Sequence, residues 1–374
     1  MTQAAKQQPY IIKSEPIEER YARGWHCLGK SSDFTSEPQS MLYFGKKLAV
    51  YRGDQDGELH VLDSYCPHMG ADLSRGKVTN DSLHCPFHDW SWGPDGRCNR
   101  IPYADKIPDK AVIGSYPTTE VNGLAFVWHD PEGNEPIPEQ YPSRIEDYYS
   151  GEWTDWNLAK FTIHSNCREL VDNMADMAHF GPVHYSTVQN FRNVQDGHKF
   201  TQYMSGGHEI LADAGDGFTS VATYEGPAYM TTTMTGSMEG NEMVTHLLVT
   251  HVPVNTEQFD IRLGVMMKKI PGVSEAENQA MVDEYTNMSV ESFVQDVDIW
   301  NNKIRVDNPL LCDGDGPLHM VRKWYSQFYR DVADIPSSLK GHKERETKIK
   351  YDHAKQDSGE TGDSSRREPI AASQ

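Results

Sequence analysis

Two short cysteine–histidine pairs constrain this chain more than any other feature of its sequence. Cys66 is followed closely by His68, and Cys85 is followed closely by His88. Two thiolates can hold one ferric ion and two neutral imidazoles a second, which gives a [2Fe–2S] cluster with a raised reduction potential. Because each pair mixes the two ligand types, each loop can give one ligand to each iron. The pattern predicts a cluster held between two loops by Cys66, His68, Cys85 and His88.

A zinc-stabilised binding module and ordinary buried cysteines are the alternatives to a cluster. Zinc fingers with two cysteines and two histidines keep like ligands together, whereas the pairs here are mixed. Gly70 and Gly76 permit tight turns in the first loop, and Trp90 and Trp92 follow the second pair, where they could screen a cluster from water. The other four cysteines lack such partners, and we expect them to pack in the core: Cys27, Cys98, Cys167 and Cys312.

Composition excludes some classes of partner. The 374 residues carry a net charge of -20, which argues against nucleic acids and anionic membrane surfaces, since basic patches bind those. The N-terminus lacks the apolar core of a signal peptide. No apolar run approaches the roughly 20 residues of a membrane span. We therefore expect a soluble cytoplasmic protein, with cysteines that do not form structural disulfides.

The order of patterns along the chain predicts an α+β fold in two domains. Residues 1–20 are polar and predict an arm, and residues 21–131 alternate short β-like runs with turn signals, which predicts a small all-β domain. Residues 132–340 form the second domain, which begins with a proline-rich linker. Residues 341–374 are polar and charged and predict a disordered tail.

Within the second domain we expect helices packed on an antiparallel sheet. The stretches Asn166–His179 and Glu275–Arg305 have helical patterns, and residues 200–270 are rich in the residues that favour strands. Part of that sheet, Tyr224–Met243, is rich in Met and Thr. It could form an apolar pocket or equally an ordinary core sheet.

A second group of metal-ligating residues lies in the second domain. His179 and His184 are five residues apart, and Asp176 precedes them. Five residues carry a side chain roughly 140° around a helix, so we expect Gly181-Pro182 to distort or end the helix and let both imidazoles reach one metal.

Two histidines and one carboxylate leave open positions on Fe(II) for O₂, so the site needs a distant acid. Asp296 and Asp298 on the predicted long helix are the candidates. They cannot both face the same point, because residues two apart on a helix diverge. The alternative is that these histidines and acids are ordinary polar residues. The upstream cluster motif favours the metal site.

At this point the sequence resembles the α subunits of Rieske non-haem iron oxygenases over nearly its whole length, and most closely the 3-ketosteroid 9α-hydroxylase oxygenases. The resemblance rests on Cys66–Gly76, Cys85–Trp90, Asn166–His179, Gln295–Trp300 and Asp307–Pro317, followed by Trp324–Tyr329. It implies an N-terminal Rieske [2Fe–2S] domain and a C-terminal helix-grip catalytic domain.

The resemblance also implies roles for residues. The mononuclear Fe(II) would be held by His179, His184 and Asp296, with Asp176 and Asn173 as catalytic residues beside it. It further implies a homotrimer in which Asp176 of one subunit bridges to His88 of the next. Gly181-Pro182 and Ser186–Asn190 depart from the family pattern, and we expect these positions to lie beside the iron and to influence the substrate.

The function implied is that of a terminal monooxygenase. Electrons would come from a separate NADH-dependent flavin and iron–sulfur reductase, because the chain has no dinucleotide fingerprint. O₂ would then hydroxylate an apolar substrate, most closely a 3-ketosteroid at C9. The alternatives are a Rieske oxygenase that hydroxylates or demethylates another substrate, and a Rieske electron-transfer protein without a working iron site.

Overall fold

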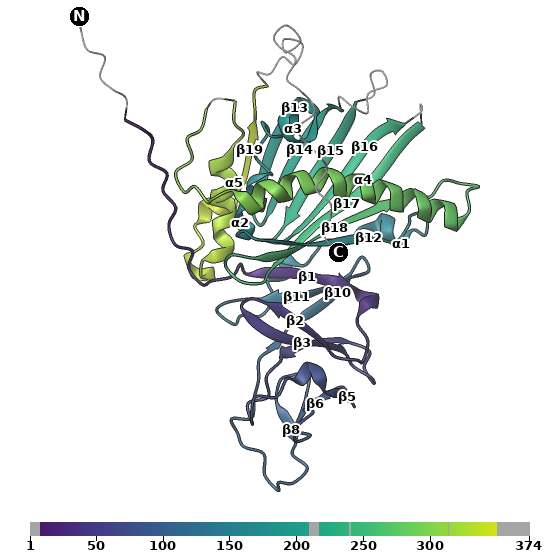
Figure 1. Cartoon of the computed structure of the whole chain (residues 1–374), viewed down its shortest axis with the longest axis vertical. Helices are drawn as coiled ribbons and strands as arrows, with labels where there is room; N and C mark the ends of the chain where they lie inside the picture. Colours follow the sequence, from purple (N-terminus) through teal and green to yellow (C-terminus); the bar gives the residue numbers. More distant parts are fainter. Residues whose placement is uncertain (1–7, 209–216, 239–240, 313, 350–374) are drawn as a thin grey trace, which may run out of the picture.

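The computed structural model describes residues 8–208, 217–238, 241–312 and 314–349. A small β domain lies at one end of the molecule and a larger domain of sheet and helices at the other (Figure 1). This arrangement confirms the predicted α+β fold.

The small domain consists of three antiparallel sheets. Their strand orders are β1-β11-β10, β2-β3-β4-β9 and β5-β6-β7-β8. The strands are β1 (Gly24–Lys30), β2 (Gln39–Tyr43), β3 (Lys46–Arg52), β4 (Leu59–Asp63), β5 (Lys77–Thr79), β6 (Ser82–His84), β7 (Ser91–Trp92), β8 (Cys98–Arg100), β9 (Ser115–Tyr116), β10 (Thr118–Val121) and β11 (Leu124–His129).

Two glycines show why the first cluster loop needs residues without side chains. Gly70 has φ of 76°, a conformation that costs other residues energy. Gly76 follows the 3₁₀ helix Leu73–Arg75, and a Cβ atom there would lie 1.9 Å from the carbonyl oxygen of His84. The loop can therefore pass close to β6 only because position 76 is glycine.

The large domain is built on one eight-stranded antiparallel sheet in the order β12-β18-β17-β16-β15-β14-β13-β19. This sheet confirms the prediction for residues 200–270. Its strands are β12 (Asn157–Ile163), β13 (Ser186–Asp196), β14 (Lys199–His208), β15 (Phe218–Glu225), β16 (Tyr229–Met238), β17 (Asn241–Pro253), β18 (Phe259–Met267) and β19 (His342–Glu346).

β18 is buried along its whole length, because both of its faces are covered. On one side its apolar residues pack with Phe293 and Trp300 of a long helix. On the other side the buried guanidinium of Arg262 donates hydrogen bonds to the carbonyl of Cys27 (3.1 Å) and to the hydroxyl of Tyr43 (3.2 Å). The two domains therefore meet in a buried seam whose polar groups are paired across it.

The long helix α4 (Glu275–Asn302) crosses one face of the sheet (Figure 1). Ser274 and Glu277 form a capping box at its start, which satisfies backbone N–H groups that have no helical partner. The helix ends three residues before the predicted Arg305. The remaining α-helices are α1 (Glu146–Tyr149), α2 (Cys167–Asp172), α3 (Phe180–His184) and α5 (Leu318–Tyr325). None of the helices in the described ranges is both long and apolar enough to cross a membrane.

The prediction of one helix over Asn166–His179 is wrong. The helix ends at Asp172, a turn region follows, and α3 begins at Phe180. Gly181-Pro182 does not end a helix but lies in the first turn of α3, where a proline is tolerated because its missing N–H would have no helical partner. The break in the helix therefore lies before His179, and both histidines belong to the short helix that follows it, His179 as its N-cap and His184 as its last residue.

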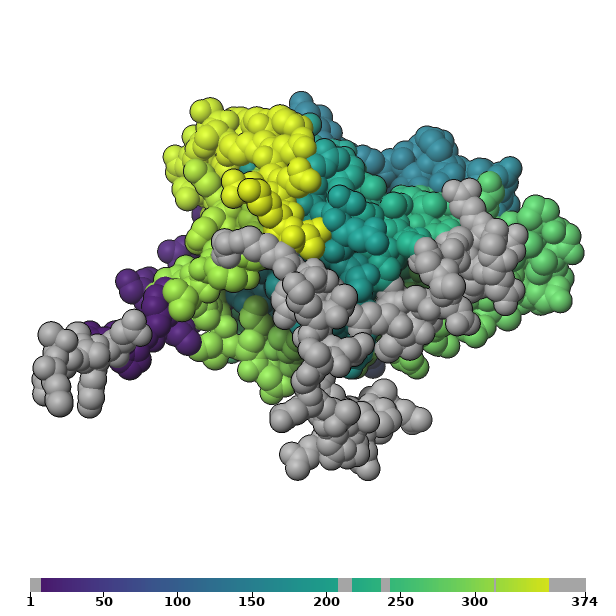
Figure 2. Space-filling view, turned by 90° about the horizontal axis from the view of Figure 1, so that it is seen from above, coloured from purple at the N-terminus to yellow at the C-terminus, as the bar shows by residue number. Residues whose placement is uncertain are grey.

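Two further predictions need correction. The tail does not begin at residue 341, since β19 pairs with β13. In Figure 2 the yellow end of the described chain lies against the teal strands. Residues 350–374 lie outside the described residues. Cys312 is exposed rather than packed, whereas Cys27, Cys98 and Cys167 are buried as expected.

The predicted N-terminal arm is extended and lies against the loop after α4. Over residues 8–20 it contains neither helix nor strand. The hydroxyl of Tyr10 donates to the carbonyl of Asn308 (2.5 Å), and the amide of Glu15 donates to Asp307 (2.7 Å).

Candidate active site

The cluster loops place two buried cysteines beside two adjacent histidines. Cys66 and Cys85 are buried, and the rings of His68 and His88 lie 4.6 Å apart. The Nδ1 atoms of both histidines are buried and have no hydrogen-bond partner among the described residues. Because buried polar atoms are normally paired, two unpaired nitrogens next to two thiols fit the ligand set of a [2Fe–2S] cluster.

The surroundings of the loops suit a bound metal better than free thiols. Burial raises the pKa of the Cys66 thiol to about 11, and the nearby Cys85 contributes to the increase. The positive charge of a bound metal would therefore stabilise the Cys66 thiolate. Trp90 stacks on His68, with ring centroids 4.7 Å apart, and Trp92 is fully buried.

The rim of the cluster loops is apolar and exposed. Four large side chains there are more than half exposed, namely Tyr65, Met69, Phe87 and Tyr103. Clusters of exposed apolar residues mark interaction surfaces more often than single ones do. The first loop leads into β5 and the second follows β6, and both strands lie at the end of the molecule farthest from α3 (Figure 1).

A second site joins α3 to α4. His179 is the N-cap of α3, His184 is its last residue and Asp296 lies on α4. One ligand atom of each lies within 4.8 Å of the others. Nε2 of His184 is 3.2 Å from Oδ2 of Asp296. Two imidazoles and one buried carboxylate at this separation fit a two-histidine, one-carboxylate iron site.

The two candidate acids on α4 lie in different surroundings. Asp296 is buried and belongs to this group of three. Asp298 is exposed, and its carboxylate accepts a hydrogen bond from Asn302. The helix thus turns only one of the two acids toward the histidines, as their spacing requires.

Asp176 contacts the site without belonging to the group of three. Its backbone carbonyl oxygen is 2.6 Å from Nδ1 of His179, and its carboxylate lies 3.8 Å from the same nitrogen. Burial opposes charge on His179, but the Asp176 carboxylate outweighs it and raises the pKa of His179. Burial likewise opposes the charge on Asp176, and the contact with His179 lowers its pKa. Each group therefore favours the charged form of the other.

Sequence reasoning missed a second partner of His184. The hydroxyl of Ser292 lies 3.3 Å from Nδ1 of His184. Ser292 stands one helical turn before Asp296. That spacing was the only signal in the sequence that could have indicated it.

A cavity of about 220 Å³ opens beside Asp176 and Asn173. Its other walls come from the end of α4, the following loop and α5, and include Lys303, Ile304 and Leu318. Asn173 is the C-cap of α2 and does not belong to the group of three potential ligands. The cavity places both predicted catalytic residues on a surface that an approaching group could reach.

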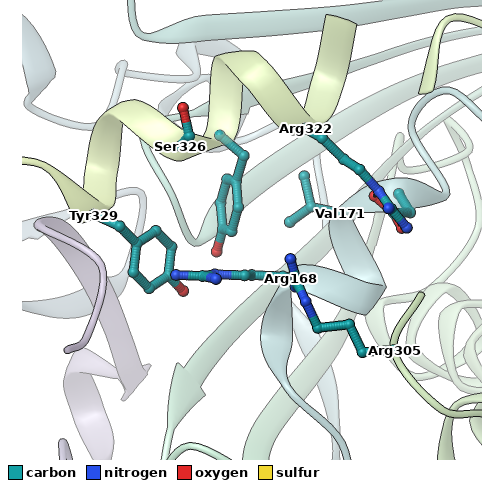
Figure 3. A pocket seen from close by; sticks show the side chains of 8 residues that line it. Arg168, Val171, Arg305, Arg322, Ser326 and Tyr329 are labelled. Carbon is teal, nitrogen blue, oxygen red and sulfur yellow. Dashed lines mark hydrogen bonds and ion pairs between the residues drawn. The ribbon is translucent and has the colours of Figure 1, made fainter. Parts of the chain in front are cut away.

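A neighbouring cavity of about 120 Å³ is lined by Arg168, Arg305 and Arg322 (Figure 3). Arg322 forms a bidentate contact with Asp172, in which Nε donates to Oδ1 (3.0 Å) and Nη2 donates to Oδ2 (2.6 Å), and this contact joins α5 to α2. The guanidinium of Arg168 lies over the ring of Tyr329, 3.9 Å from its centroid. These contacts stiffen the helix that precedes the site.

The first residues of the stretch Tyr224–Met243 pack in the ordinary hydrophobic core. Tyr224 packs with Trp324, and Tyr229 packs with Phe126 of the small domain. An apolar wall beside His179 comes instead from Phe180, which packs with a buried group formed by Met177, Phe191 and Met204.

Comparisons with known families cover both domains. Residues 24–117 match the Rieske [2Fe–2S] domain, and residues 127–329 match the 3-ketosteroid 9α-hydroxylase C-terminal domain. A 3-ketosteroid-9-alpha-monooxygenase oxygenase component from Rhodococcus rhodochrous is 44% identical over 337 residues, which cover 88% of this chain and 86% of the relative. One from Mycolicibacterium smegmatis is 43% identical over 88% of each chain.

More distant relatives share the fold. Cholesterol 7-desaturase from Xenopus laevis is 31% identical over 83% of this chain and 72% of its own. The structure of dicamba monooxygenase bound to 3,6-dichlorosalicylic acid has a TM-score of 0.69 at 18% identity and covers 83% of this chain and 98% of that one. NdmA of Pseudomonas putida, in a mutant with theobromine, has a TM-score of 0.65 at 15% identity, with 85% and 93% coverage.

Proposed function

Since the chain belongs to the 3-ketosteroid 9α-hydroxylase oxygenase family, we propose that this Rieske oxygenase hydroxylates a 3-ketosteroid at C9. It is the terminal oxygenase component of a multicomponent monooxygenase. The observation that carries the proposal is the meeting of His179, His184 and Asp296 in a chain that also carries the Rieske motif. The steroid comes from the names of the relatives, which are 42–44% identical.

We assign the cluster to Cys66, His68, Cys85 and His88, and the mononuclear iron to the group of three. A bound Fe(II) would supply the activation of O₂. The chain's own residues hold the ligands and limit access of water. Asp296 is buried, and the rings of Phe180 and His179 lie 4.3 Å apart, so one side of the site is apolar and suits an apolar substrate.

We further propose that electrons pass between subunits of a homotrimer. The apolar rim of the cluster loops and the cavity beside Asp176 lie on separate parts of one chain, which suits a head-to-tail contact that closes into a ring. In this assembly His88 of one subunit approaches Asp176 of the next. The exposed side of Asp176, whose side chain is 46% exposed, supports a bridging role. Asn173 lines the same cavity.

The proposed partner is an NADH-dependent reductase with flavin and iron–sulfur centres, and the proposed location is the cytoplasm. Support for the location comes from the cysteines, since none of the six, all of which lie among the described residues, forms a disulfide, as is usual in a reducing compartment.

Metal content tests the iron site. The purified protein is expected to hold three irons per chain, two in the cluster and one in the mononuclear site. Two irons per chain would support the alternative of an electron carrier. His179→Ala is expected to keep the visible absorbance of the cluster and to lose turnover, and turnover in that variant would refute the assignment.

A matched pair of substitutions tests the third ligand. Asp296→Asn is expected to lose the mononuclear iron and product formation, because an amide is a weaker ligand for Fe(II) than a carboxylate. Asp298→Asn, two residues away on the exposed face of α4, is expected to retain both. Equal iron content in the two variants would show that Asp296 is not a ligand.

A substrate screen tests the steroid. Turnover would be measured with a compatible reductase on androstenedione-type steroids, on steroid side-chain CoA esters and on simple aromatic compounds, with products identified by mass spectrometry. A 9α-hydroxylated steroid is expected. Turnover of a non-steroid alone would refute the substrate while leaving the oxygenase chemistry intact.

A further inference from the structure

We propose that Ser292 is a positioning residue that orients the imidazole of His184 for metal binding. The proposal rests on the iron site proposed above. Both ring nitrogens of His184 have a partner on α4: Nε2 lies 3.2 Å from the Asp296 carboxylate, and Nδ1 lies 3.3 Å from the Ser292 hydroxyl. One helix thus supplies both the neighbouring ligand and the group that determines which nitrogen faces it.

The spacing on α4 makes this double contact possible. Ser292 and Asp296 are four residues apart, so their side chains lie on the same face of the helix, one turn from each other. A neutral imidazole that offers the lone pair of Nε2 to a metal carries its proton on Nδ1. That Nδ1–H donates to the oxygen of Ser292, which fixes both the tautomer and the plane of the ring.

His179 and His184 differ in what holds their second nitrogen. Nδ1 of His179 is 2.6 Å from the backbone carbonyl of Asp176, so the local chain orients that ring. Within the described ranges, no backbone group pairs with Nδ1 of His184. Tyr185, the residue after it, is in the left-handed conformation with φ of 55°. His184 therefore depends on a side chain from a distant element, and Ser292 provides it.

Neighbouring hydroxyls on α4 behave differently. Thr286 donates to the carbonyl of Val282 (2.6 Å), and Ser289 donates to the carbonyl of Tyr285 (2.8 Å). This bond to the preceding turn is the usual one for a hydroxyl within a helix. In the part of the chain that the structure describes, Ser292 contacts His184 instead. The contrast distinguishes a positioning role from an incidental surface serine.

Iron affinity tests the proposal without reliance on turnover. The mononuclear iron would be removed from the cluster-containing protein with a chelator, and Fe(II) rebinding would be measured by anaerobic equilibrium dialysis. Loss of an outer partner of a metal-bound histidine typically weakens affinity 10- to 100-fold. Because Ser292 is exposed, we expect Ser292→Ala to weaken binding about 10-fold, near the lower limit of that range.

Three further variants complete the test. Ser292→Thr keeps the hydroxyl and is expected to restore affinity to within about twofold of the wild type, while Ser289→Ala is expected to leave it unchanged. The cluster absorbance serves as a folding control for every variant. Wild-type affinity in Ser292→Ala, or an equal loss in Ser289→Ala, would overturn the proposal. Wild-type affinity in His184→Ala would instead show that the proposed iron site itself is wrong.

Discussion

Replacing Lys303 with Met is expected to destabilise the protein through a buried carboxylate on α2. Glu169 is only 3% exposed, and its Oε2 lies 2.7 Å from Nζ of Lys303 at the end of α4. Arg305 is the next cation, at 3.9 Å. The ion pair joins the helix that precedes His179 to the helix that carries Asp296. Its loss should therefore affect both the fold and the metal site.

The structure allows the magnitude to be worked out. Two unit charges 2.7 Å apart attract by about 6 kcal/mol at an effective dielectric constant of about 20. Desolvation cancels much of this, and removing one partner of a buried pair typically costs about 3–5 kcal/mol. The side chain of Lys303 is 34% exposed, which weakens the pair, and Arg305 remains nearby. We therefore expect Lys303→Met to lower the free energy of unfolding by about 2–3 kcal/mol.

A double-mutant cycle isolates the interaction. Glu169→Gln leaves a lysine that can turn toward water, so its cost should be about 1 kcal/mol. The double variant removes both the Glu169 carboxylate and the Lys303 ammonium group and should lower the free energy of unfolding by about 1.5 kcal/mol. The coupling energy between the two residues is then about 2 kcal/mol.

Urea unfolding followed by tryptophan fluorescence measures all four proteins, with the iron content of each as a second readout. Lys268→Met, which breaks an exposed pair with Glu152, serves as the control and should lower the free energy of unfolding by less than about 0.5 kcal/mol. Costs that simply add in the double variant would refute the argument that Lys303 compensates a buried charge.

The remaining predictions concern acid, chain packing and metal removal. Burial lowers the pKa of His251 to about 3, while the unfolded chain takes up this proton near pH 6.5. The stability that neutral His251 contributes is therefore fully present above pH 6.5. As the pH drops below 6.5, this group lowers the free energy of unfolding by up to about 1.4 kcal/mol per pH unit. His251→Gln should flatten the pH dependence measured by urea unfolding, and an unchanged slope would count against this reasoning. Gly76→Ala should cost at least about 2 kcal/mol and reduce the cluster absorbance, because the new Cβ would collide with the His84 carbonyl. Gly341→Ala meets open space and should leave the melting temperature and spectrum unchanged, whereas equal effects would rule out a steric cause. A chelator should lower the iron content from three to two per chain before the cluster bleaches, since the histidines of the mononuclear site are partly exposed and the cluster cysteines are buried. Bleaching first would contradict this order.

Local motifs were the part of the molecule that the sequence predicted best. Cys66 and His68 lie in one loop, so their spacing alone indicates that they act together. The long helix was predictable as well, because Ser274 and Glu277 mark its start. The choice of Asp296 over Asp298 needed a family resemblance, since spacing along the helix excludes only that both face the metal.

Elements governed by tertiary contacts were predicted less well. Residues 173–178 have helical composition, yet the chain leaves the helix there, and the carbonyl of Asp176 pairs with His179. The strand β19 was hidden because His342–Glu346 is polar throughout. An edge strand with charged side chains has no alternation to detect, and charge at an edge also discourages pairing with other molecules. Ser292 was missed because its partner lies far away in sequence.

The seam at Arg262 has a consequence for how this enzyme would respond to dilution. A swing of the small domain would break the buried hydrogen bonds of Arg262 to Cys27 and Tyr43, which opposes a motion that would carry the cluster of one chain to its own iron. In the proposed ring, electron delivery then depends on neighbours remaining bound. When the protein is diluted far enough for the subunits to separate, the specific activity would fall. Each separated subunit would still keep the visible absorbance of its cluster and all three of its irons.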